Sequence, residues 1–530
     1  MRRYLLPLAV TALLAGCQDL DVVNPNEPDR ERVLSRPDDV ESLIASSFRL
    51  WYTTAQNEYP NIPFAAMADN ITGGFFDYGV FDVSQEPRVA WNNSSLNTRD
   101  GTNRLPWYNT YRALSTANDG LFALDSGIDL DAGTAGTRTV RARAFAKWIQ
   151  GLSHGYLGLI FDKAYIVTEH TVLEEMDQTL FYDYAEVRDT AIAELEEAIA
   201  AAQSATFTIP ADPTWVNGVE ISNQTLARLA NSYIARFMVY TARTPAERAA
   251  VDWDQVVQRI DAGITADFSP HGALEIIEGN YRRLLARVRN APRPSDHIRP
   301  DMMALGPADI SGGYQTWLAT PMANRMPWQM NTPDRRIQGA TATAPGIYMG
   351  YNRNNIWSAD RGTFRFSWYY YHRSGVGDSW FTGPQLTLLR SEMDLLKAEA
   401  LIRLGRAAEA VPLINKTRVA NGQLPPVTVD GPPEGATCVP RKFSGACGSL
   451  WDALRYEKTI ELLGVEGGVA WWDGRGWGAL QTGTPIHMPV PGRELDNLGL
   501  PNYTFGGNAP DGAAPPDPER CPVALARCPA

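Results

Sequence analysis

The chain has 530 residues, of which 44% are hydrophobic and 10% aromatic, so it is long enough to bury a sizeable core. Its formal net charge of −12 and its lack of a Lys/Arg cluster argue against nucleic-acid binding, which usually needs a basic patch. After the first sixteen residues no apolar run reaches the ~20 residues that span a bilayer. We therefore expect a body that is soluble in build.

Residues 1–16 have the pattern of a secretory signal peptide. Arg2 and Arg3 give a positive start, an apolar core follows, and small residues precede Cys17. The sequence Leu-Ala-Gly-Cys also resembles the bacterial lipobox, which implies cleavage before Cys17 and lipidation of its thiol. Several acyl chains make a stable anchor, because each buried CH₂ contributes ~0.8 kcal/mol. The alternative is an ordinary secretory signal whose Cys17 later pairs with another cysteine.

Helical periodicity predominates after a Pro- and Asn-rich tether at 17–34. We predict helices at 35–51, 108–124, 138–165, 184–202, 222–242 and 245–264, and a pair of helices within 386–422. Gly405 and Asn421-Gly422 end the two members of that pair, which resembles a tetratricopeptide unit. In the 184–202 helix, Glu194, Glu196 and Glu197 are expected mostly on a solvated face.

Three stretches lack a sustained period. Residues 52–106 and 270–384 mix aromatics with Gly, Pro and Asn, although 364–373 has strand-type composition. The tail at 505–530 is Pro- and Gly-rich and is not expected to form a core.

Four cysteines lie in two close pairs. Cys438 and Cys447 bracket one short loop, and Cys521 and Cys528 bracket another. Such spacing suits local disulfides in an exported protein. A zinc site is the alternative, but it usually has a different spacing and often histidine ligands.

We find no motif that argues for catalysis. The six histidines form no HExxH motif or close pair, and the sequence has neither a nucleophile elbow nor a P-loop. His154 is expected to be a packed or surface side chain. Glu457 and Glu461 share a helix face, as a glycosidase pair of carboxylates could, but we expect them to be exposed or paired with Arg455 or Lys458. We predict no cofactor, no metal site and no catalytic residue.

Four segments in a fixed order resemble the SusD/RagB family of outer-membrane nutrient-binding lipoproteins. They are CQDLDVVNPNEPD (17–29), RARAFAKWIQGLSHGYLGLIFDKAY (141–165), a segment at 388–427, and LRYEKTIELLGVEGGVAWWDGRGWG (454–478). In the second, Asp162 matches the family's Asp while Phe161 replaces its usual Gly. In the last, an Arg of the family pattern is replaced near Val469, and the matching residues are Arg455, Glu457, Glu461, Glu466, Gly467, Trp472, Asp473, Arg475, Trp477 and Gly478.

This resemblance implies a mostly α fold of tetratricopeptide-like helix pairs, with large irregular, loop-rich insertions and short β-strands, over residues 35–504. It also implies an outer-membrane lipoprotein that is anchored through Cys17 and exposed at the cell surface beside a TonB-dependent SusC-like transporter. Such a protein captures an oligosaccharide, or an oligopeptide, without converting it.

Aromatic side chains on irregular segments are the candidates for ligand contact, because flat apolar sugar faces stack on rings. These candidates are Phe75, Phe76, Tyr78, Trp91, Tyr314, Trp317, Trp328 and Trp357. The alternative for each ring is packing of a loop on the helices, and Trp472 and Trp477 are expected in the core. Two other classes of protein remain open: an exported glycoside hydrolase, and a structural surface lipoprotein that docks proteins.

Overall fold

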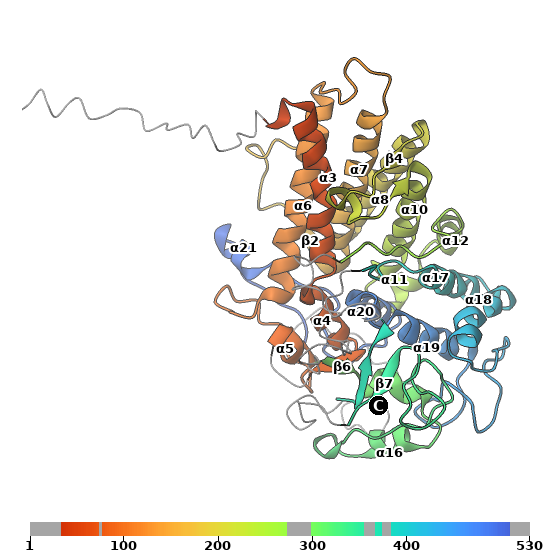
Figure 1. The fold of residues 1–530 in the computed structure, drawn as a ribbon. Coiled ribbons are helices and arrows are strands. Elements are labelled where there is room, and N and C mark those ends of the chain that lie inside the picture. The colour runs from red at the N-terminus through yellow and green to blue at the C-terminus, as the bar shows by residue number, and fades with distance from the viewer. Residues whose placement is uncertain (1–32, 74–76, 273–297, 354–365, 374–382, 509–530) are drawn as a thin grey trace, which may run out of the picture.

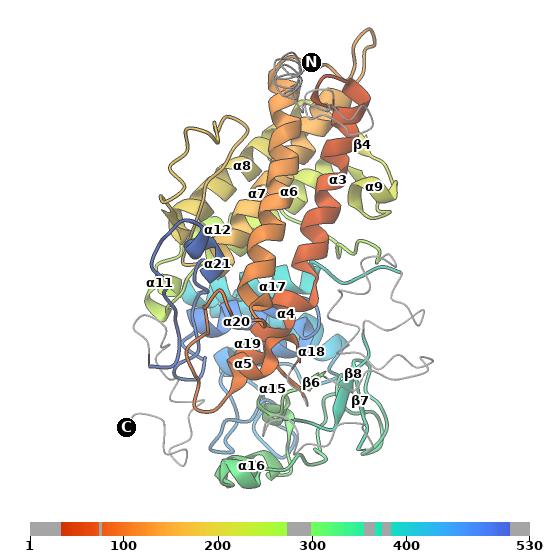
Figure 2. The same cartoon turned by 90° about the vertical axis from the view of Figure 1, so that its left-hand side faces the viewer.

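The computed structural model describes residues 33–73, 77–272, 298–353, 366–373 and 383–508. Long helices form one end of the molecule, and a loop-rich region with short helices and strands forms the other (Figures 1 and 2). The predicted mostly α fold is confirmed. None of the described helices is long and apolar enough to cross a membrane.

The first group of long helices packs closely through small residues. It consists of α3 (Pro37–Ala55), α6 (Gly101–Asp125), α7 (Arg138–Ile160), α8 (Tyr184–Ser204) and α10 (Asn223–Tyr240). A Cβ atom on Gly155 of α7 would lie 2.1 Å from the Phe237 ring of α10. Glycine at this position therefore lets the two helices approach closely.

A second group of helices continues from the first toward the loop-rich end (Figure 1). It contains α11 (Pro245–Ala249), α12 (Trp253–Asp261), α17 (Arg390–Arg403), α18 (Ala407–Ala420), α19 (Leu450–Leu462) and α20 (Gly467–Gly476). The short α21 (Gly492–Asn497) lies apart from this group beside α6, where the Tyr108 hydroxyl donates to the Glu494 carboxylate at 2.8 Å. The prediction of one continuous helix at 245–264 was wrong, because the residues between α11 and α12 are not helical. There the Asp252 side chain accepts a hydrogen bond from the Gln255 N–H and starts a new helix.

The prediction that residues 52–106 are irregular was also partly wrong. This stretch contains α4 (Glu58–Met67), η1 (Asp77–Gly79), α5 (Val80–Ser84) and the start of α6. Pro60 and Pro63 lie within α4 and hid its period. The other short helices are α9 (Pro213–Val216), α15 (Met302–Leu305), η2 (Gly306–Ala308), α16 (Gly313–Ala319) and η3 (Met322–Asn324).

The described strands form four small antiparallel pairs. They are β1 (Ile71–Gly73) with β6 (Ile298–Pro300), β2 (Lys163–Ala164) with β3 (Tyr182–Asp183), β4 (Thr208–Ile209) with β5 (Ile221–Ser222), and β7 (Met349–Tyr351) with β8 (Tyr369–Tyr371). Strand β8 lies within the 364–373 segment, whose composition predicts a strand. Each pair joins loops rather than building a sheet-based core.

Candidate functional site

Two adjoining cavities lie along one face of α19. The larger measures about 80 Å³ and the smaller about 30 Å³, and both are lined by Ala304 and Thr459. Asp452, Arg455 and Tyr456 also line the larger cavity. Spacings of three and four residues place these side chains on the same face of the helix, so α19 forms a common floor.

The start of α19 is fixed by a reciprocal cap. The Ser449 hydroxyl accepts a hydrogen bond from the Asp452 N–H, and the Asp452 carboxylate accepts one from the Ser449 N–H at 2.8 Å. A capping box of this kind satisfies two backbone donors at a helix start. Asp452 therefore has a structural task as well as a place in the cavity wall.

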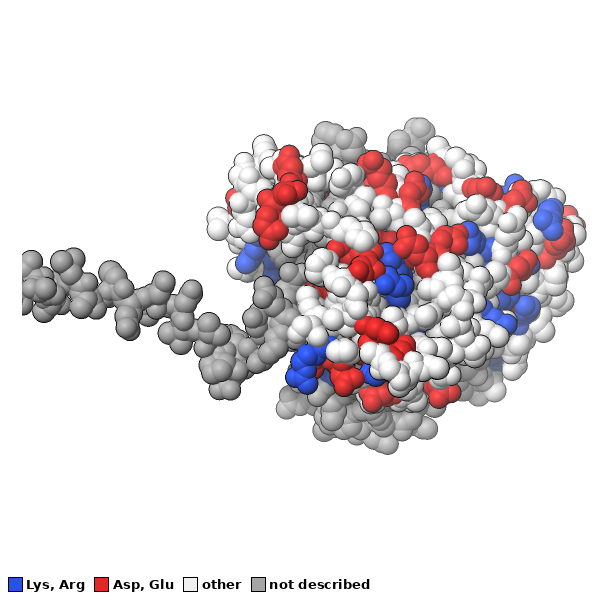
Figure 3. Space-filling model, turned by 90° about the horizontal axis from the view of Figure 1, so that it is seen from above, with Lys and Arg blue, Asp and Glu red and all other residues white. Residues whose placement is uncertain are grey.

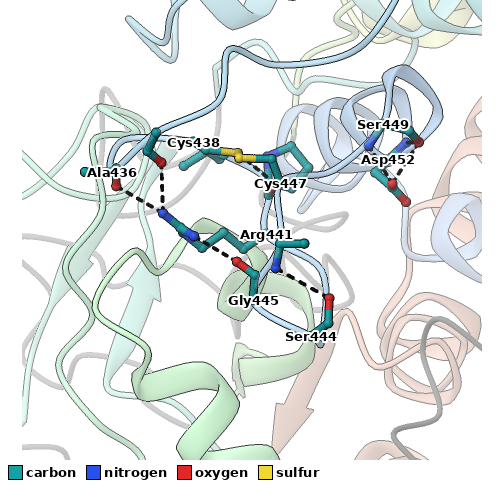
Figure 4. The surroundings of a disulfide bond; sticks show 12 residues. Ala436, Cys438, Arg441, Ser444, Gly445, Cys447, Ser449 and Asp452 are labelled. Carbon is teal, nitrogen blue, oxygen red and sulfur yellow. Dashed lines mark hydrogen bonds between the residues drawn. A yellow bond between two sulfur atoms is a disulfide. The ribbon is translucent and has the colours of Figure 1, made fainter.

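A disulfide closes the loop that forms one wall of the larger cavity. Cys438 and Cys447 are bonded, with their Cα atoms 5.8 Å apart (Figure 4). The Arg441 guanidinium donates to the carbonyl of Gly445 within the loop and to those of Gly435 and Ala436 just before it, at 2.8–3.2 Å. These bonds hold the loop in shape and place Pro440, Arg441, Lys442 and Phe443 in the wall of the larger cavity.

Aromatic side chains form the opposite side of the larger cavity. Tyr314 lines it, and the Tyr314 ring lies 5.9 Å from that of Phe443. Trp317 and Trp328 each lie 6.2 Å from Tyr314. Tyr314 and Trp317 are buried, whereas Phe443 and Trp328 are half-buried. The structure thus brings three predicted aromatic candidates together, with Phe443 at the cavity itself.

The other aromatic candidates lie elsewhere. Tyr78 is half-buried with its ring 6.1 Å from that of Tyr59. Trp91 is buried, and its backbone N–H donates to the Phe505 carbonyl in the C-terminal segment. Phe75, Phe76 and Trp357 lie outside the described residues, as do Cys17, Cys521 and Cys528.

Charged side chains of both signs line the larger cavity. Arg441, Lys442 and Arg455 line it, and Asp452 is the one carboxylate among its described lining residues. Lys442 Nζ lies 3.6 Å from the Asp452 carboxylate. The sequence analysis missed Lys442 and Phe443 as candidate site residues, although a basic and aromatic segment between two paired cysteines was a usable signal.

Glu457 and Glu461 are buried, so the expectation of exposure or of pairing with Arg455 or Lys458 was wrong. Arg336 Nη1 lies 2.6 Å from Glu457 and 2.9 Å from Glu461, and Arg336 Nη2 lies 2.7 Å from Asp334. Burial disfavours the charge of Arg336, yet these three carboxylates raise the pKa of its guanidinium well above its ordinary value. This set, which we call the Arg336 cluster, joins the 334–336 loop to α19.

Other acidic residues of the 454–478 segment also have buried cationic partners. Glu466 lies 2.8 Å from Arg236, and Asp473 lies 2.7 Å from Lys458 and 2.8 Å from Arg248. Burial raises the pKa of both carboxyls, and the neighbouring cations oppose that shift. Trp472 is buried as expected, whereas Trp477 is half-buried and lines the smaller cavity.

Two further clusters of polar side chains have partners within the protein. His154 is buried, and its Nδ1 lies 2.8 Å from the Glu194 carboxylate. The expectation that Glu194 lies on the solvated side of its helix was therefore wrong, because it pairs inward with α7.

Asp125, Glu169 and His170 have ligand atoms within 4.8 Å of one another, but Glu169 already accepts hydrogen bonds at 2.7 Å from Lys147 and from Gln150.

Comparison with solved structures identifies the fold. No protein-family model matches the sequence, and no curated protein matches it. In contrast, 57 chains of solved structures match the fold. Together with the helix pairs and loop-rich insertions described above, these matches show that the chain has the SusD-like fold.

Three of these structures illustrate the similarity. A SusD superfamily protein from Parabacteroides distasonis is 13% identical, with a TM-score of 0.58 and coverage of 89% of this chain and 99% of the other. A SusD superfamily protein from Bacteroides thetaiotaomicron is 16% identical, with a TM-score of 0.51 and coverage of 83% and 90%. A SusD-like carbohydrate-binding protein from Bacteroides fragilis is 12% identical, with a TM-score of 0.53 and coverage of 84% and 87%.

Proposed function

We propose that this protein captures an oligosaccharide at the cell surface and delivers it to a TonB-dependent SusC-like transporter in the outer membrane. The observation that carries the proposal is the larger cavity, where an aromatic ring and hydrogen-bonding cations line one opening on a SusD-like fold. Aromatic rings stack on the apolar faces of sugars, while a few placed polar groups fix the orientation of a ligand. An oligopeptide is the alternative cargo.

The proposal includes attachment to the membrane through lipidated Cys17. The residues before it have the composition of a signal peptide, and the following tether at 17–34 leads to the folded body. Metabolic labelling with radioactive palmitate is expected to mark the wild-type chain and not the Cys17→Ala variant. Equal labelling of both would contradict the anchor.

We propose binding without conversion of the ligand. A glycoside hydrolase needs two carboxylates ~5–9.5 Å apart on either side of the scissile bond, and among the described residues Asp452 is the one carboxylate that lines the larger cavity. The lining carboxylates of the smaller cavity are Asp69 and Asp473, which are paired with Arg88 and with Lys458 and Arg248. No described feature favours the hydrolase over a binding protein.

Calorimetry of the purified chain against a glycan panel and a peptide pool tests the cargo. We expect heat of binding from at least one glycan, and mass spectrometry of the recovered glycan should show an unchanged chain length. Binding confined to peptides would replace the proposed cargo, and shortened glycan would contradict binding without conversion. For the partner, capture of the tagged lipoprotein in mild detergent is expected to recover a large outer-membrane protein, and repeated recovery of the lipoprotein alone would contradict the transporter.

A further inference from the structure

The disulfide between Cys438 and Cys447 lies next to the larger cavity. Residues 440–443, which lie between the two cysteines in the chain, form a wall of that cavity. Figure 4 shows the S–S bond joining the two arms of the loop, close to the start of α19. Cys438 is buried, whereas Cys447 is half-buried. The crosslink therefore closes a loop that lines the proposed ligand site.

The first arm of this loop is attached to neighbouring parts of the protein. The Arg418 guanidinium donates a hydrogen bond to the Val439 carbonyl at 2.7 Å. The backbone N–H of Arg441 donates to the Pro307 carbonyl at 2.7 Å, and Pro307 itself lines the larger cavity. The arm from Cys438 to Arg441 thus has partners outside the loop.

The returning arm of the loop pairs with the first arm. The Lys442 N–H donates to the Ala446 carbonyl at 2.9 Å, and the Gly448 N–H donates to the Pro440 carbonyl at 3.0 Å. Two paired strands are at best marginally stable in water when nothing else holds them. The disulfide adds a covalent bond between the arms, so we expect it to fix the place of the Phe443 ring in the cavity wall.

The helical body is held together by other contacts. Within the described part of the chain, Cys438 and Cys447 are the only cysteines. At the end formed by the long helices, Lys and Arg side chains lie interspersed with Asp and Glu on the surface (Figure 3), and Arg138 lies 2.7 Å from Asp38. Helix packing and ion pairs do not react with thiols. A thiol reductant therefore acts, within the described structure, at the wall of the larger cavity.

We propose that the Cys438–Cys447 disulfide is a positioning element of the binding site, so that reduction weakens glycan binding while the helical body stays folded. The inference rests on the proposed glycan-binding function and names a control of that same site. Dithiothreitol breaks the S–S bond by thiol–disulfide exchange: both cysteines become thiols, and the dithiol is oxidised to its cyclic disulfide. The opened loop gains freedom that binding must remove, which costs affinity.

Calorimetry of the purified mature chain before and after reduction tests the proposal. The probe is the member of the glycan panel that binds the oxidised chain most tightly. We expect dithiothreitol to raise its Kd about tenfold, because the opened loop must be ordered again on binding. Reoxidation with oxidised glutathione should restore the original Kd.

Two double variants assign the effect to one pair of cysteines. Cys438→Ala/Cys447→Ala should bind the probe as weakly as the reduced wild type and should no longer respond to dithiothreitol. Cys521→Ala/Cys528→Ala is the matched control, because it removes the other closely spaced pair in the sequence. This control should keep both the wild-type Kd and the response to dithiothreitol. Circular dichroism should show the same helix content in all samples.

Hydrogen exchange separates a positioning role from a general effect on stability. The amides of Lys442 and Gly448 bond across the loop and should exchange faster after reduction. Amides within α7 should exchange at an unchanged rate, because that helix lies in the long-helix group. Faster exchange throughout α7 would show that the disulfide stabilises the whole fold and would overturn its role as a local positioning element.

The outcomes also separate this inference from the proposed function. Equal Kd values for the oxidised and reduced chains, or wild-type binding by Cys438→Ala/Cys447→Ala, would overturn the inference and leave glycan capture in place. A control that no longer responds to dithiothreitol would overturn the assignment to Cys438 and Cys447. Failure of the oxidised chain to bind any glycan would overturn the proposed function, and this inference with it.

Discussion

The two sides of α19 use charged residues in different ways. On one side, Glu457 and Glu461 are buried in the Arg336 cluster, and Arg418 and Arg373 lie 3.7 Å and 3.6 Å from them. On the other side, Asp452 and Arg455 are half-buried and line the larger cavity. Buried charges that contact one another inside the protein fix the fold, because removing one partner leaves the other charge buried and unpaired. Half-buried charged groups at a cavity can also contact a ligand, so burial separates structural charge from candidate binding charge.

The largest expected effect comes from removing the cation of the Arg336 cluster. Arg336→Met would leave Asp334, Glu457 and Glu461 buried without their shared cation. We expect the free energy of unfolding to fall by about 3–5 kcal/mol, the usual cost of removing one partner of a buried pair. Urea unfolding followed by circular dichroism measures it. Arg406→Gln, at an exposed pair with Glu409, is the control and should leave the midpoint unchanged. A small change in the free energy of unfolding for Arg336→Met would mean that the buried ion pairs of the Arg336 cluster do not fix the fold.

A smaller loss of stability is expected at a cation that lines a cavity and is also paired with a buried carboxylate. Lys458 lines the smaller cavity, but its Nζ lies 2.7 Å from Asp473. Lys458→Met should lower the free energy of unfolding by about 1.5–3 kcal/mol, the contribution of a hydrogen bond to a charged group, since Arg248 still contacts Asp473. Urea unfolding will measure this change, and calorimetry should show glycan affinity within twofold of wild type. A large loss of affinity with full stability would place Lys458 among the binding residues instead.

The ring nitrogens of His487 are buried near the cations Arg243 and Arg475, so this residue tests how burial affects a titratable group. Burial lowers the pKa of His487 to about 2, with smaller contributions from Arg243 and Arg475. Above pH ~6.5 the ring is neutral in both the folded and unfolded states. Below that value the unfolded chain binds a proton that the folded chain does not, so stability should fall by up to about 1.4 kcal/mol per pH unit as the pH decreases.

Unfolding of wild type and His487→Phe between pH 7 and pH 5 measures this contribution as a difference in slope. The variant should lose less stability than the wild type over that interval, whatever its stability at neutral pH. Parallel pH profiles would contradict a neutral buried imidazole at this position.

The smallest effect on stability is expected at the cavity itself. Lys442 is partly exposed, and its Nζ lies 3.6 Å from the Asp452 carboxylate. Because exposed ion pairs contribute little, Lys442→Gln should change the free energy of unfolding by less than about 0.5 kcal/mol, while it weakens binding of the glycan. Thermal unfolding and calorimetry on the same sample compare the two effects. A destabilisation as large as that of Arg336→Met would place Lys442 among the structural cations.

The sequence predicted helices where a face repeats over several turns, as in α7 and α10, and it placed the α17/α18 pair. It missed α4 because prolines interrupt the pattern, and it joined α11 to α12 because the Asp252 cap is a single-residue signal. The partner of Glu457 could not be predicted, since Arg336 lies 121 residues away and no local period links them.

The candidate site was harder to predict for the same reason. Its walls come from α15 and the Tyr314 region on one side and from the disulfide loop and α19 on the other. Three aromatic candidates proved to be neighbours, although Tyr314 and Trp317 are buried and only part of that group reaches the surface. Tertiary folding decides which rings and charges share one cavity, and a single sequence contains little information about it.

A crystal structure of the chain grown with its tightest-binding oligosaccharide tests the account most directly. We expect density for an intact sugar chain in the larger cavity, with one sugar ring against Phe443 and a hydroxyl within hydrogen-bonding distance of a polar lining side chain. A well-ordered sugar bound elsewhere, with the larger cavity empty, would contradict the proposed site.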